Sequence, residues 1–162
     1  SAVKFKLGFP MGIFELADFT GMDVIHKATV EMHLRDKKVI NPHKTVEKMF
    51  NEKKLGQKSG EGYYKYSDDK YERVELSEEL AQKCNPIQLV ANVLNNAAWL
   101  ITNGASDIEE IEKAVKLGLG LRKPLFETAK EIGIQNIVDE LNKLTENFGE
   151  FYKPDPLLES MI

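Results

Sequence analysis

The chain has 162 residues, which is enough for one average domain or two small ones. Hydrophobic residues make up 42% and charged residues 30%, a composition that excludes a disordered tail, a collagen and a disulfide-stapled miniprotein. The 26 acidic side chains outnumber the 22 Lys and Arg and give a net charge of -4, which argues against a nucleic-acid partner.

Apolar residues spaced three and four apart predict an all-α fold of about eight helices. In chain order, the clearest predicted helices cover 13–19, 24–35 with Asp23 as its cap, 45–53, 86–101, a segment that begins at Ser106, 125–132 and 136–144. Ser106 and Glu109 have the spacing of a capping box, and Asn103-Gly104 is typical of a helix end.

A glycine-rich segment interrupts the helical pattern between residues 54 and 71. Three glycines within seven residues precede three tyrosines, which predicts turns leading into a short irregular or extended segment near 60–70. No second strand is apparent in the sequence. The charged stretch 67–79 is the best linker candidate and predicts a division of the chain into 1–76 and 77–162.

The chain contains an internal repeat at an offset of 112 residues. Residues 2–25 read AVKFKLGFPMGIFELADFTGMDVI, and residues 114–137 read AVKLGLGLRKPLFETAKEIGIQNI. Ten positions are identical: Ala2, Val3, Lys4, Leu7, Gly8, Phe14, Glu15, Ala17, Gly21 and Ile25. Both conserved glycines fall where turns are needed, so we interpret the match as a duplication.

The repeat also predicts something about the start of the chain. Two predicted helices precede the second copy, but nothing precedes the first. We therefore expect the equivalent helices to lie upstream in a longer parent protein.

The sequence further predicts a cytoplasmic protein without a membrane span. The N-terminal residues have no apolar stretch long enough for a signal peptide, and the longest purely apolar run is Ala97–Ile101. The single cysteine, Cys84, cannot form an internal disulfide, and we expect it to be a small buried side chain in a reducing compartment.

Several short motifs resemble functional sites but favour structural roles. Lys58 and Ser59 follow Gln57 rather than the glycine of a phosphate-binding loop, and the Gly118–Gly120 pair lacks the third glycine of a dinucleotide fingerprint. The three histidines lack the usual spacing of zinc ligands on a helix. Glu15 and Asp18 could share a helix face as an acid/base pair. Because Glu15 recurs in the second copy and Asp18 becomes Lys130, capping is the better interpretation for Glu15.

Two segments carry a family resemblance. Gly8–Asp23, GFPMGIFELADFTGMD, and Leu55–Tyr66, LGQKSGEGYYKY, together resemble the C-terminal domain of NAD-dependent 3-hydroxyacyl-CoA dehydrogenases. Ile13 replaces the usual proline of the first motif, and Met22 its usual leucine. Residues 85–144 look like a degenerate second copy, as in long dehydrogenases, including those fused to an enoyl-CoA hydratase.

This resemblance implies a 6-phosphogluconate dehydrogenase C-terminal-like fold of two related helical units and a role in fatty-acid β-oxidation. The family oxidises 3-hydroxyacyl-CoA with NAD, and its catalytic His, Glu and Asn lie on segments that do not match this chain. The resemblance therefore implies no catalytic residue here and an inactive fragment. Lys58, which in the family reaches toward NAD, is the one cofactor-binding candidate.

The expected partners are the chain's own N-terminal Rossmann domain, acyl-CoA and a second copy, or a pseudo-dimer within the chain. One rival is a non-enzymatic helical interaction module, and another is the helical domain of a hydroxyacid or phosphogluconate dehydrogenase. The sequence predicts no metal site, and it leaves open the acyl chain length and the oligomeric state.

Overall fold

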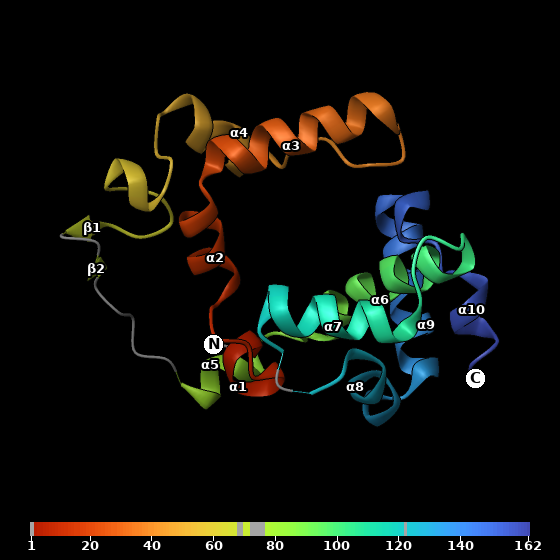
Figure 1. The fold of residues 1–162 in the computed structure, drawn as a ribbon. Coiled ribbons are helices and arrows are strands. Elements are labelled where there is room, and N and C mark those ends of the chain that lie inside the picture. Colours follow the sequence, from red (N-terminus) through yellow and green to blue (C-terminus); the bar gives the residue numbers. More distant parts are fainter. Residues whose placement is uncertain (1, 68–69, 72–76, 122) are drawn as a thin grey trace. The chain divides into compact units, whose positions relative to one another are not determined.

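The computed structural model describes residues 2–67, 70–71, 77–121 and 123–162 (Figure 1). This part is mostly helical, with a single two-stranded hairpin among the described residues, which confirms the predicted fold class. Its helices are α1 Ala2–Leu7, α2 Ile13–Thr20, α3 Met22–Arg35, α4 Lys44–Asn51, α5 Glu78–Gln82, α6 Ile87–Thr102, α7 Ile108–Leu119, α8 Leu125–Ile132, α9 Ile134–Phe148 and α10 Pro156–Glu159. Two short 3₁₀ turns cover Gln57–Ser59 and Glu150–Tyr152.

The seven helices predicted from apolar spacing are all present, and α8 has the predicted bounds. Two predicted caps are wrong. Gly21 rather than Asp23 precedes α3, and Asp107 rather than Ser106 caps α7, its carboxylate accepting from the Glu110 N–H at 2.9 Å. The extended segment also has a partner that the sequence did not reveal, because β1 Tyr66–Ser67 pairs antiparallel with β2 Lys70–Tyr71.

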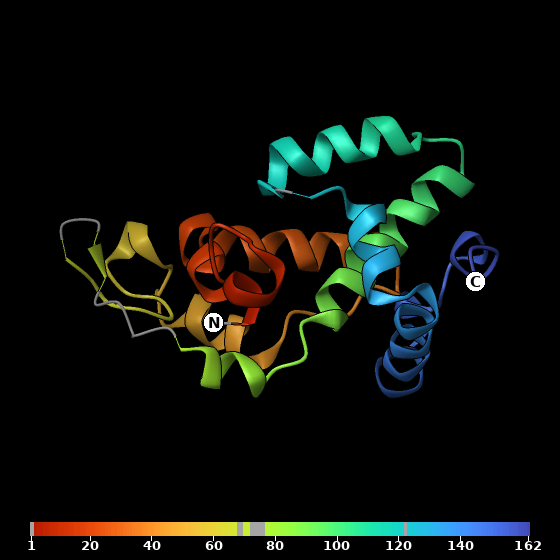
Figure 2. The same cartoon turned by 90° about the horizontal axis from the view of Figure 1, so that it is seen from below.

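The chain forms two compact units. Unit 1 combines Ser1–Pro10 with Glu78–Ile162, and unit 2 is Met11–Ser77. Helix α1 belongs to unit 1 because it packs beside α5 (Figure 2). The predicted division at 76 and 77 stays a prediction, since most of the proposed linker lies outside the described residues.

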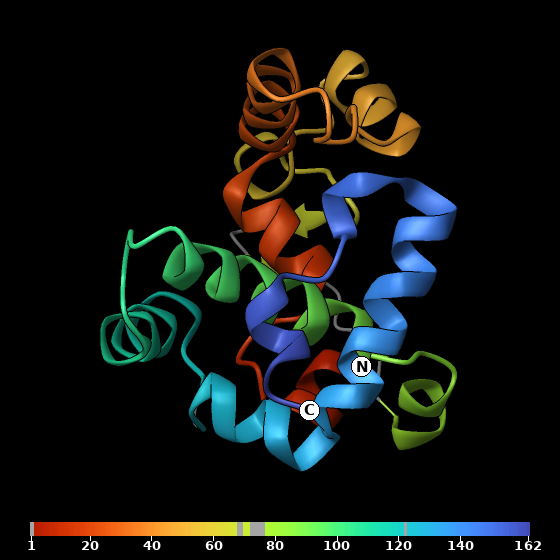
Figure 3. The same ribbon diagram turned by 90° about the vertical axis from the view of Figure 1, so that its right-hand side faces the viewer.

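Unit 1 has a core organised by α6. This helix is apolar on most of its circumference, and α8, α9 and α10 pack around it (Figure 3). The side chains of Leu94, Ala98, Ile137, Leu141 and Leu158 are fully buried there. The small alanines of α6 allow the neighbouring helices to approach closely, so this unit buries a contiguous apolar cluster.

A polar side chain joins α6 to the start of α10. Asn95 is buried, and its amide makes two hydrogen bonds to the backbone before α10. Its Nδ2 donates to the carbonyl of Lys153 at 2.9 Å, and its Oδ1 accepts from the N–H of Asp155 at 2.7 Å. Asp155 in turn caps α10 by accepting from the N–H of Leu157 at 3.0 Å. One asparagine thereby satisfies two backbone groups inside the core.

Unit 2 consists of α2, α3 and α4 followed by a glycine-rich loop and the small hairpin. Helix α4 lies along α3 (Figure 1). His26 of α3 stacks on Phe50 of α4 with ring centroids 4.3 Å apart. Among the described residues of this unit, the buried apolar side chains are those of Met22 and Met49, a smaller set than the apolar cluster of unit 1.

Several helices of the two copies begin at residues that lie 112 positions apart, the offset of the sequence repeat. Helices α2 and α8 have equivalent first and last residues, α3 and α9 begin at equivalent residues, and so do α4 and α10. The turn glycines match in conformation as well. Gly8 and Gly120 have φ of 66° and 65°, and Gly21 and Gly133 have φ of 96° and 92°. The similarity therefore extends from α1 to α4, well beyond the 24 residues that revealed it.

The copies also meet within unit 1. Pro10, from the turn after α1, lies against Gly120, its Cγ 3.4 Å from where a Cβ of residue 120 would be. Among the described helices, none is long and apolar enough to cross a membrane.

Replacement of Asn95 by alanine should destabilise unit 1. The buried N–H of Asp155 and the carbonyl of Lys153 would lose their partners, at a cost of about 1–3 kcal/mol in the free energy of unfolding. Urea unfolding followed by circular dichroism measures this loss. Asn96→Ala, which changes an exposed neighbour on the same helix, is the control. Equal unfolding midpoints for the two variants would contradict the role given to Asn95.

Candidate functional site

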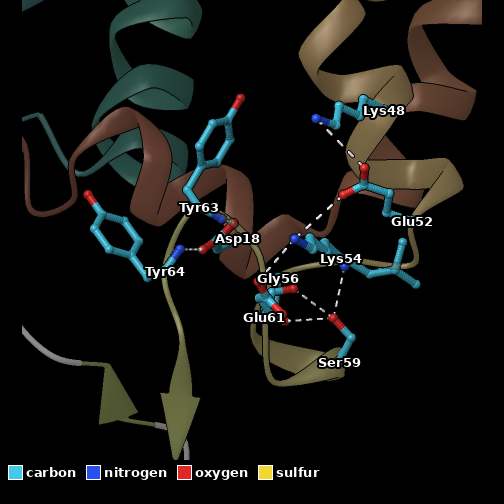
Figure 4. A network of polar contacts seen from close by, with 10 residues as sticks. Asp18, Lys48, Glu52, Lys54, Gly56, Ser59, Glu61, Tyr63 and Tyr64 are labelled. Carbon is cyan, nitrogen blue, oxygen red and sulfur yellow. Dashed lines mark hydrogen bonds and ion pairs between the residues drawn. The ribbon is translucent and has the colours of Figure 1, made fainter.

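The candidate site is the glycine loop, Leu55–Tyr66, which closes around a carboxylate on α2 (Figure 4). Asp18 is only 1% exposed. Its Oδ1 accepts from the N–H of Tyr63 at 2.8 Å, and its Oδ2 accepts from the N–H of Tyr64 and the hydroxyl of Tyr66, both at 2.9 Å. A buried carboxylate is costly unless hydrogen-bonded, so helix and loop depend on each other.

Two glycines of the loop are required by this close approach. A Cβ at Gly56 would overlap the backbone of Asp18, and a Cβ at Gly62 would overlap its carboxylate. Gly56 also has a positive φ of 93°, a conformation that other residues rarely adopt. Gly56 and Gly62 therefore stand where a larger residue would collide with Asp18.

Ser59 fixes the tip of the loop. Its hydroxyl accepts from the N–H of Leu55 at 2.8 Å and lies 2.9 Å from the carbonyl of Glu61. The N–H of Gly56 donates to that same carbonyl at 2.9 Å. The turn that carries Lys58 is thus held by hydrogen bonds on both sides (Figure 4).

Lys58, the predicted cofactor-binding residue, lies on the 3₁₀ turn at the start of the loop. Its ammonium forms an ion pair with Asp23 in the first turn of α3. The Lys58 side chain is 46% exposed and that of Asp23 is 26% exposed. The hydrogen bond from Lys58 holds the pKa of Asp23 below its ordinary value of 3.8. The loop therefore presents a cation that is oriented by a partner and still accessible.

Two of the tyrosines around Asp18, Tyr63 and Tyr66, have raised pKa values. Burial raises the pKa of Tyr66, and its hydrogen bond to the carboxylate of Asp18 raises it further. Burial also raises the pKa of Tyr63, with a smaller contribution from the charge of Asp18. Tyr66 consequently stays a hydrogen-bond donor at neutral pH, as its position requires.

Surface ion pairs flank the loop. Lys54 lies 3.2 Å from Glu61 and 3.5 Å from Glu52, and Lys48 lies 3.8 Å from Glu52 (Figure 4). The carboxylate of Glu61 is the main cause of the raised pKa of Lys54. Because these side chains are largely exposed, the pairs contribute little to stability.

The other candidate residues from the sequence make helix caps or local contacts rather than a site. The carboxylate of Glu15 accepts from the N–H of Gly12 at 2.5 Å, which confirms its capping role. His33 lies with its Nδ1 2.5 Å from the carbonyl of Val39, and His43 caps α4. Cys84 is exposed after α5, so the expectation of a buried thiol is wrong; it lies in the polar turn that precedes α6. In the described part of the chain, no cluster of metal-ligating side chains occurs.

The sequence does not reveal the structural role of Asp18. It stands there as a residue of the first family motif and as one half of a possible acid/base pair with Glu15. The repeat holds one signal, because the residue equivalent to Asp18 in the second copy is Lys130, which cannot accept hydrogen bonds.

Comparisons with known proteins agree with the sequence motifs. Residues 1–66 and 88–162 match the family described as "3-hydroxyacyl-CoA dehydrogenase, C-terminal domain". Mitochondrial hydroxyacyl-coenzyme A dehydrogenase of Rattus norvegicus is 38% identical over 68 residues, which are 41% of this chain and 22% of that protein. Fatty acid oxidation complex subunit alpha of Idiomarina loihiensis is 26% identical over 180 residues, 97% of this chain and 24% of that protein.

Two solved structures share the fold. The 3-hydroxybutyryl-CoA dehydrogenase of Escherichia coli K12 superposes with a TM-score of 0.75 and 20% identity, over 99% of this chain and 52% of that one. The dehydrogenase part of multifunctional enzyme 1 from C. elegans superposes with a TM-score of 0.67 and 20% identity, over 98% and 40%. The chain therefore spans at most about half the length of these relatives.

Replacement of Asp18 by asparagine should destabilise unit 2. The amide has only one acceptor oxygen and would place an NH₂ group against a backbone N–H, so we expect a loss of about 2–4 kcal/mol. Chemical denaturation monitored by tyrosine fluorescence measures it. Asp36→Asn, at an exposed carboxylate that accepts one backbone hydrogen bond, is the matched control. Wild-type stability in Asp18→Asn would contradict the arrangement.

The ion pair with Lys58 should be visible in the titration of Asp23. A group whose pKa is lowered on folding contributes stability above its unfolded pKa and loses it as the pH falls through the folded value. The contribution of this pair should therefore be complete above about pH 4 and disappear in stronger acid. Lys58→Met should return the pKa of Asp23 toward 3.8, measured by carboxyl ¹³C NMR. Lys54→Met is the control, and an unchanged Asp23 titration in Lys58→Met would contradict the pairing.

Proposed function

Since the chain belongs to the 3-hydroxyacyl-CoA dehydrogenase C-terminal domain family, we propose that it is the helical C-terminal part of an NAD-dependent dehydrogenase. The reaction oxidises 3-hydroxyacyl-CoA to 3-oxoacyl-CoA. Carbon 3 gives a hydride to NAD, and the hydroxyl gives its proton to a general base. The observation that carries this proposal is the family match over two segments that together cover most of the chain.

The duplicated helices support a tandem arrangement. We infer that the chain contains a first family copy, which carries the glycine loop, followed by a second, degenerate copy. In this proposal the tandem replaces, within one chain, the pairing that two separate C-terminal domains would make. The proposed substrate is an acyl-CoA, and the proposed partner is an N-terminal dinucleotide-binding part of the same protein.

The residues present fit one contact to NAD rather than a complete NAD site. An ammonium has three N–H donors, and the ion pair with Asp23 leaves donors of Lys58 for another acceptor. Its half-exposed position suits a contact to a phosphate or a ribose hydroxyl of the dinucleotide. When bound, NAD supplies the hydride acceptor. The role of this chain is then to bind and orient, while the general base lies on the other part of the protein.

The two rivals raised by the sequence are less well supported. A non-enzymatic interaction module does not account for an accessible lysine held on a rigid loop, and the family match argues against it. The same match argues against a hydroxyacid or phosphogluconate dehydrogenase. A cytoplasmic location stays a prediction, and some of the matched relatives are named as mitochondrial proteins.

The full-length protein should reduce NAD in the presence of 3-hydroxybutyryl-CoA or a longer 3-hydroxyacyl-CoA, measured by absorbance at 340 nm. The 162-residue chain alone should be inactive because it has no base or dinucleotide fold within its matched segments. In the full-length protein, Lys58→Met should raise the KM for NAD roughly tenfold with a small change in kcat, the effect of losing one charged contact.

Lys54→Met, immediately before the loop and paired with Glu61 and Glu52, is the control and should leave the KM for NAD unchanged. An inactive full-length protein with every 3-hydroxyacyl-CoA tested would overturn the proposed activity. NAD reduction by the isolated chain would overturn the division of labour. An unchanged KM in Lys58→Met would overturn the role of that residue alone.

A further inference from the structure

The end of the α3–α4 pair, residues 33–48, carries a concentrated positive charge. We call this stretch the hairpin end. It contains five cations and two carboxylates, so its formal charge is +3, although the whole chain has a net charge of -4. All seven charged side chains are exposed. The cations are Arg35, Lys37, Lys38, Lys44 and Lys48, and the carboxylates are Asp36 and Glu47.

These cations are largely free of partners. Arg35 lies 3.9 Å from Glu31, and Lys48 lies 3.8 Å from Glu52, in two ion pairs that are mostly exposed to water. Such pairs are weak. The other three cations of the hairpin end make no ion pair with a described residue. The positive charge is therefore available to a partner.

Two exposed apolar side chains lie among the cations. Leu34 in the last turn of α3 is 60% exposed, and Ile40 in the connection is 39% exposed. The connection has a defined conformation, because Nδ1 of His33 lies 2.5 Å from the carbonyl oxygen of Val39. The hairpin end thus presents apolar and cationic side chains together on an ordered turn.

The second copy has the opposite charge at the equivalent residues. Residues 145–160 contain four carboxylates and one lysine, a formal charge of −3. Glu146 replaces Leu34, and Glu150 replaces Lys38. Glu146 is exposed although α6 completes the apolar core of its copy, so the position of Leu34 faces outward in the duplicated unit itself. Neither the cations nor the exposed leucine is required by the fold.

The hairpin end is distant from the glycine loop. Lys58 pairs with Asp23 in the first turn of α3, whereas Leu34 lies in the last turn of this 14-residue helix (Figure 1). A helix of that length spans about 21 Å. A partner at the hairpin end would therefore leave Lys58 accessible.

We propose that the hairpin end is a peripheral contact site for a membrane surface that contains anionic lipids. The cations meet the lipid phosphates, and Leu34 and Ile40 enter the boundary between headgroups and acyl chains. The contact lies on the surface of the membrane and spans nothing. It goes beyond the proposed dehydrogenase activity and does not depend on it.

An anionic lipid surface fits these side chains better than an acidic protein or a nucleic acid does. Cations alone would suit any of the three, but Leu34 and Ile40 would stay in water against a purely charged partner. Interfacial binding uses both buried apolar area and attraction to anionic lipids. The end of a helical hairpin also meets a fluid surface without needing a groove of matching shape.

Co-sedimentation of the full-length protein with lipid vesicles tests the proposal. The probes are vesicles of phosphatidylcholine alone and vesicles in which about one third of the lipid is phosphatidylglycerol, an anionic lipid. Binding to the anionic vesicles should be on the order of tenfold stronger than binding to the neutral ones. Added salt should weaken it, because the exposed charges are screened.

Charge variants locate the contact. Lys37→Gln combined with Lys38→Gln should lower the partition coefficient on anionic vesicles about 25-fold, at about fivefold for each cation. Lys113→Gln combined with Lys116→Gln is the matched control. It makes the same change in net charge at two exposed lysines of α7 and should leave binding unchanged.

Apolar variants show whether side chains enter the lipid. Leu34→Gln should weaken binding severalfold, whereas Leu117→Gln, at a 76% exposed leucine of unit 1, should not. Leu34→Trp in a Trp99→Phe background provides a single fluorophore at the hairpin end. Its emission should shift to the blue when anionic vesicles are added, because the indole leaves water.

Several results would overturn the proposal. These are equal binding to neutral and anionic vesicles, anionic binding that survives the change of Lys37 and Lys38, and unchanged emission from the Leu34→Trp variant. Binding to polyglutamate without binding to anionic vesicles would identify an acidic protein as the partner instead. If another part of the full-length protein covers the hairpin end, the absence of vesicle binding will show it. No readout involves NAD or acyl-CoA, so the outcome is separate from that of the dehydrogenase assay.

Discussion

The buried carboxylate of Asp18 is the constraint on which the organisation of unit 2 depends. A charged group excluded from water needs several donors, and α2 alone cannot supply them to a side chain at this position. The donors come from Tyr63, Tyr64 and Tyr66, 45 to 48 residues away along the chain. Helix and loop can therefore form only together. These long-range hydrogen bonds favour one arrangement of the loop, because a shift of the loop would leave the carboxylate of Asp18 or a backbone N–H without a partner.

The same loop also positions Lys58, whose side chain is partly exposed to solvent. Lys58 is positioned by a turn whose shape is set by Gly56 and Ser59, and its ammonium is oriented by Asp23 of the next helix. A flexible lysine normally loses much rotamer entropy on binding an anion. Because the ion pair with Asp23 already orients Lys58 in the folded chain, part of this entropy loss occurs on folding rather than on binding. The arrangement suits a residue that makes a single oriented contact with a ligand held mainly by another part of the protein.

The helices could be predicted from the sequence, but much of the site could not. Apolar spacing and turn glycines located α2, α6 and α8 because a helix buries residues at a fixed period, which is a local property. The pairing of β1 with β2 escaped notice, since each strand has only two residues and no alternation to detect. The role of Asp18 depends on donors far along the chain, and no local pattern reports them. The family resemblance identified Lys58, whereas its pairing with Asp23 required the structure.

The two copies of the duplicated helical unit are stabilised in different ways. In the second copy, α8 and α9 pack against α6 in a contiguous apolar cluster, and Asn95 completes the polar contacts of that core. In the first copy, the buried carboxylate of Asp18 joins α2 to the glycine loop. The residue equivalent to Asp18 in the second copy is Lys130, so α8 is held by apolar packing rather than by a buried carboxylate. The same pair of helices is therefore stabilised by a polar network where it supports Lys58 and by an apolar core where it does not.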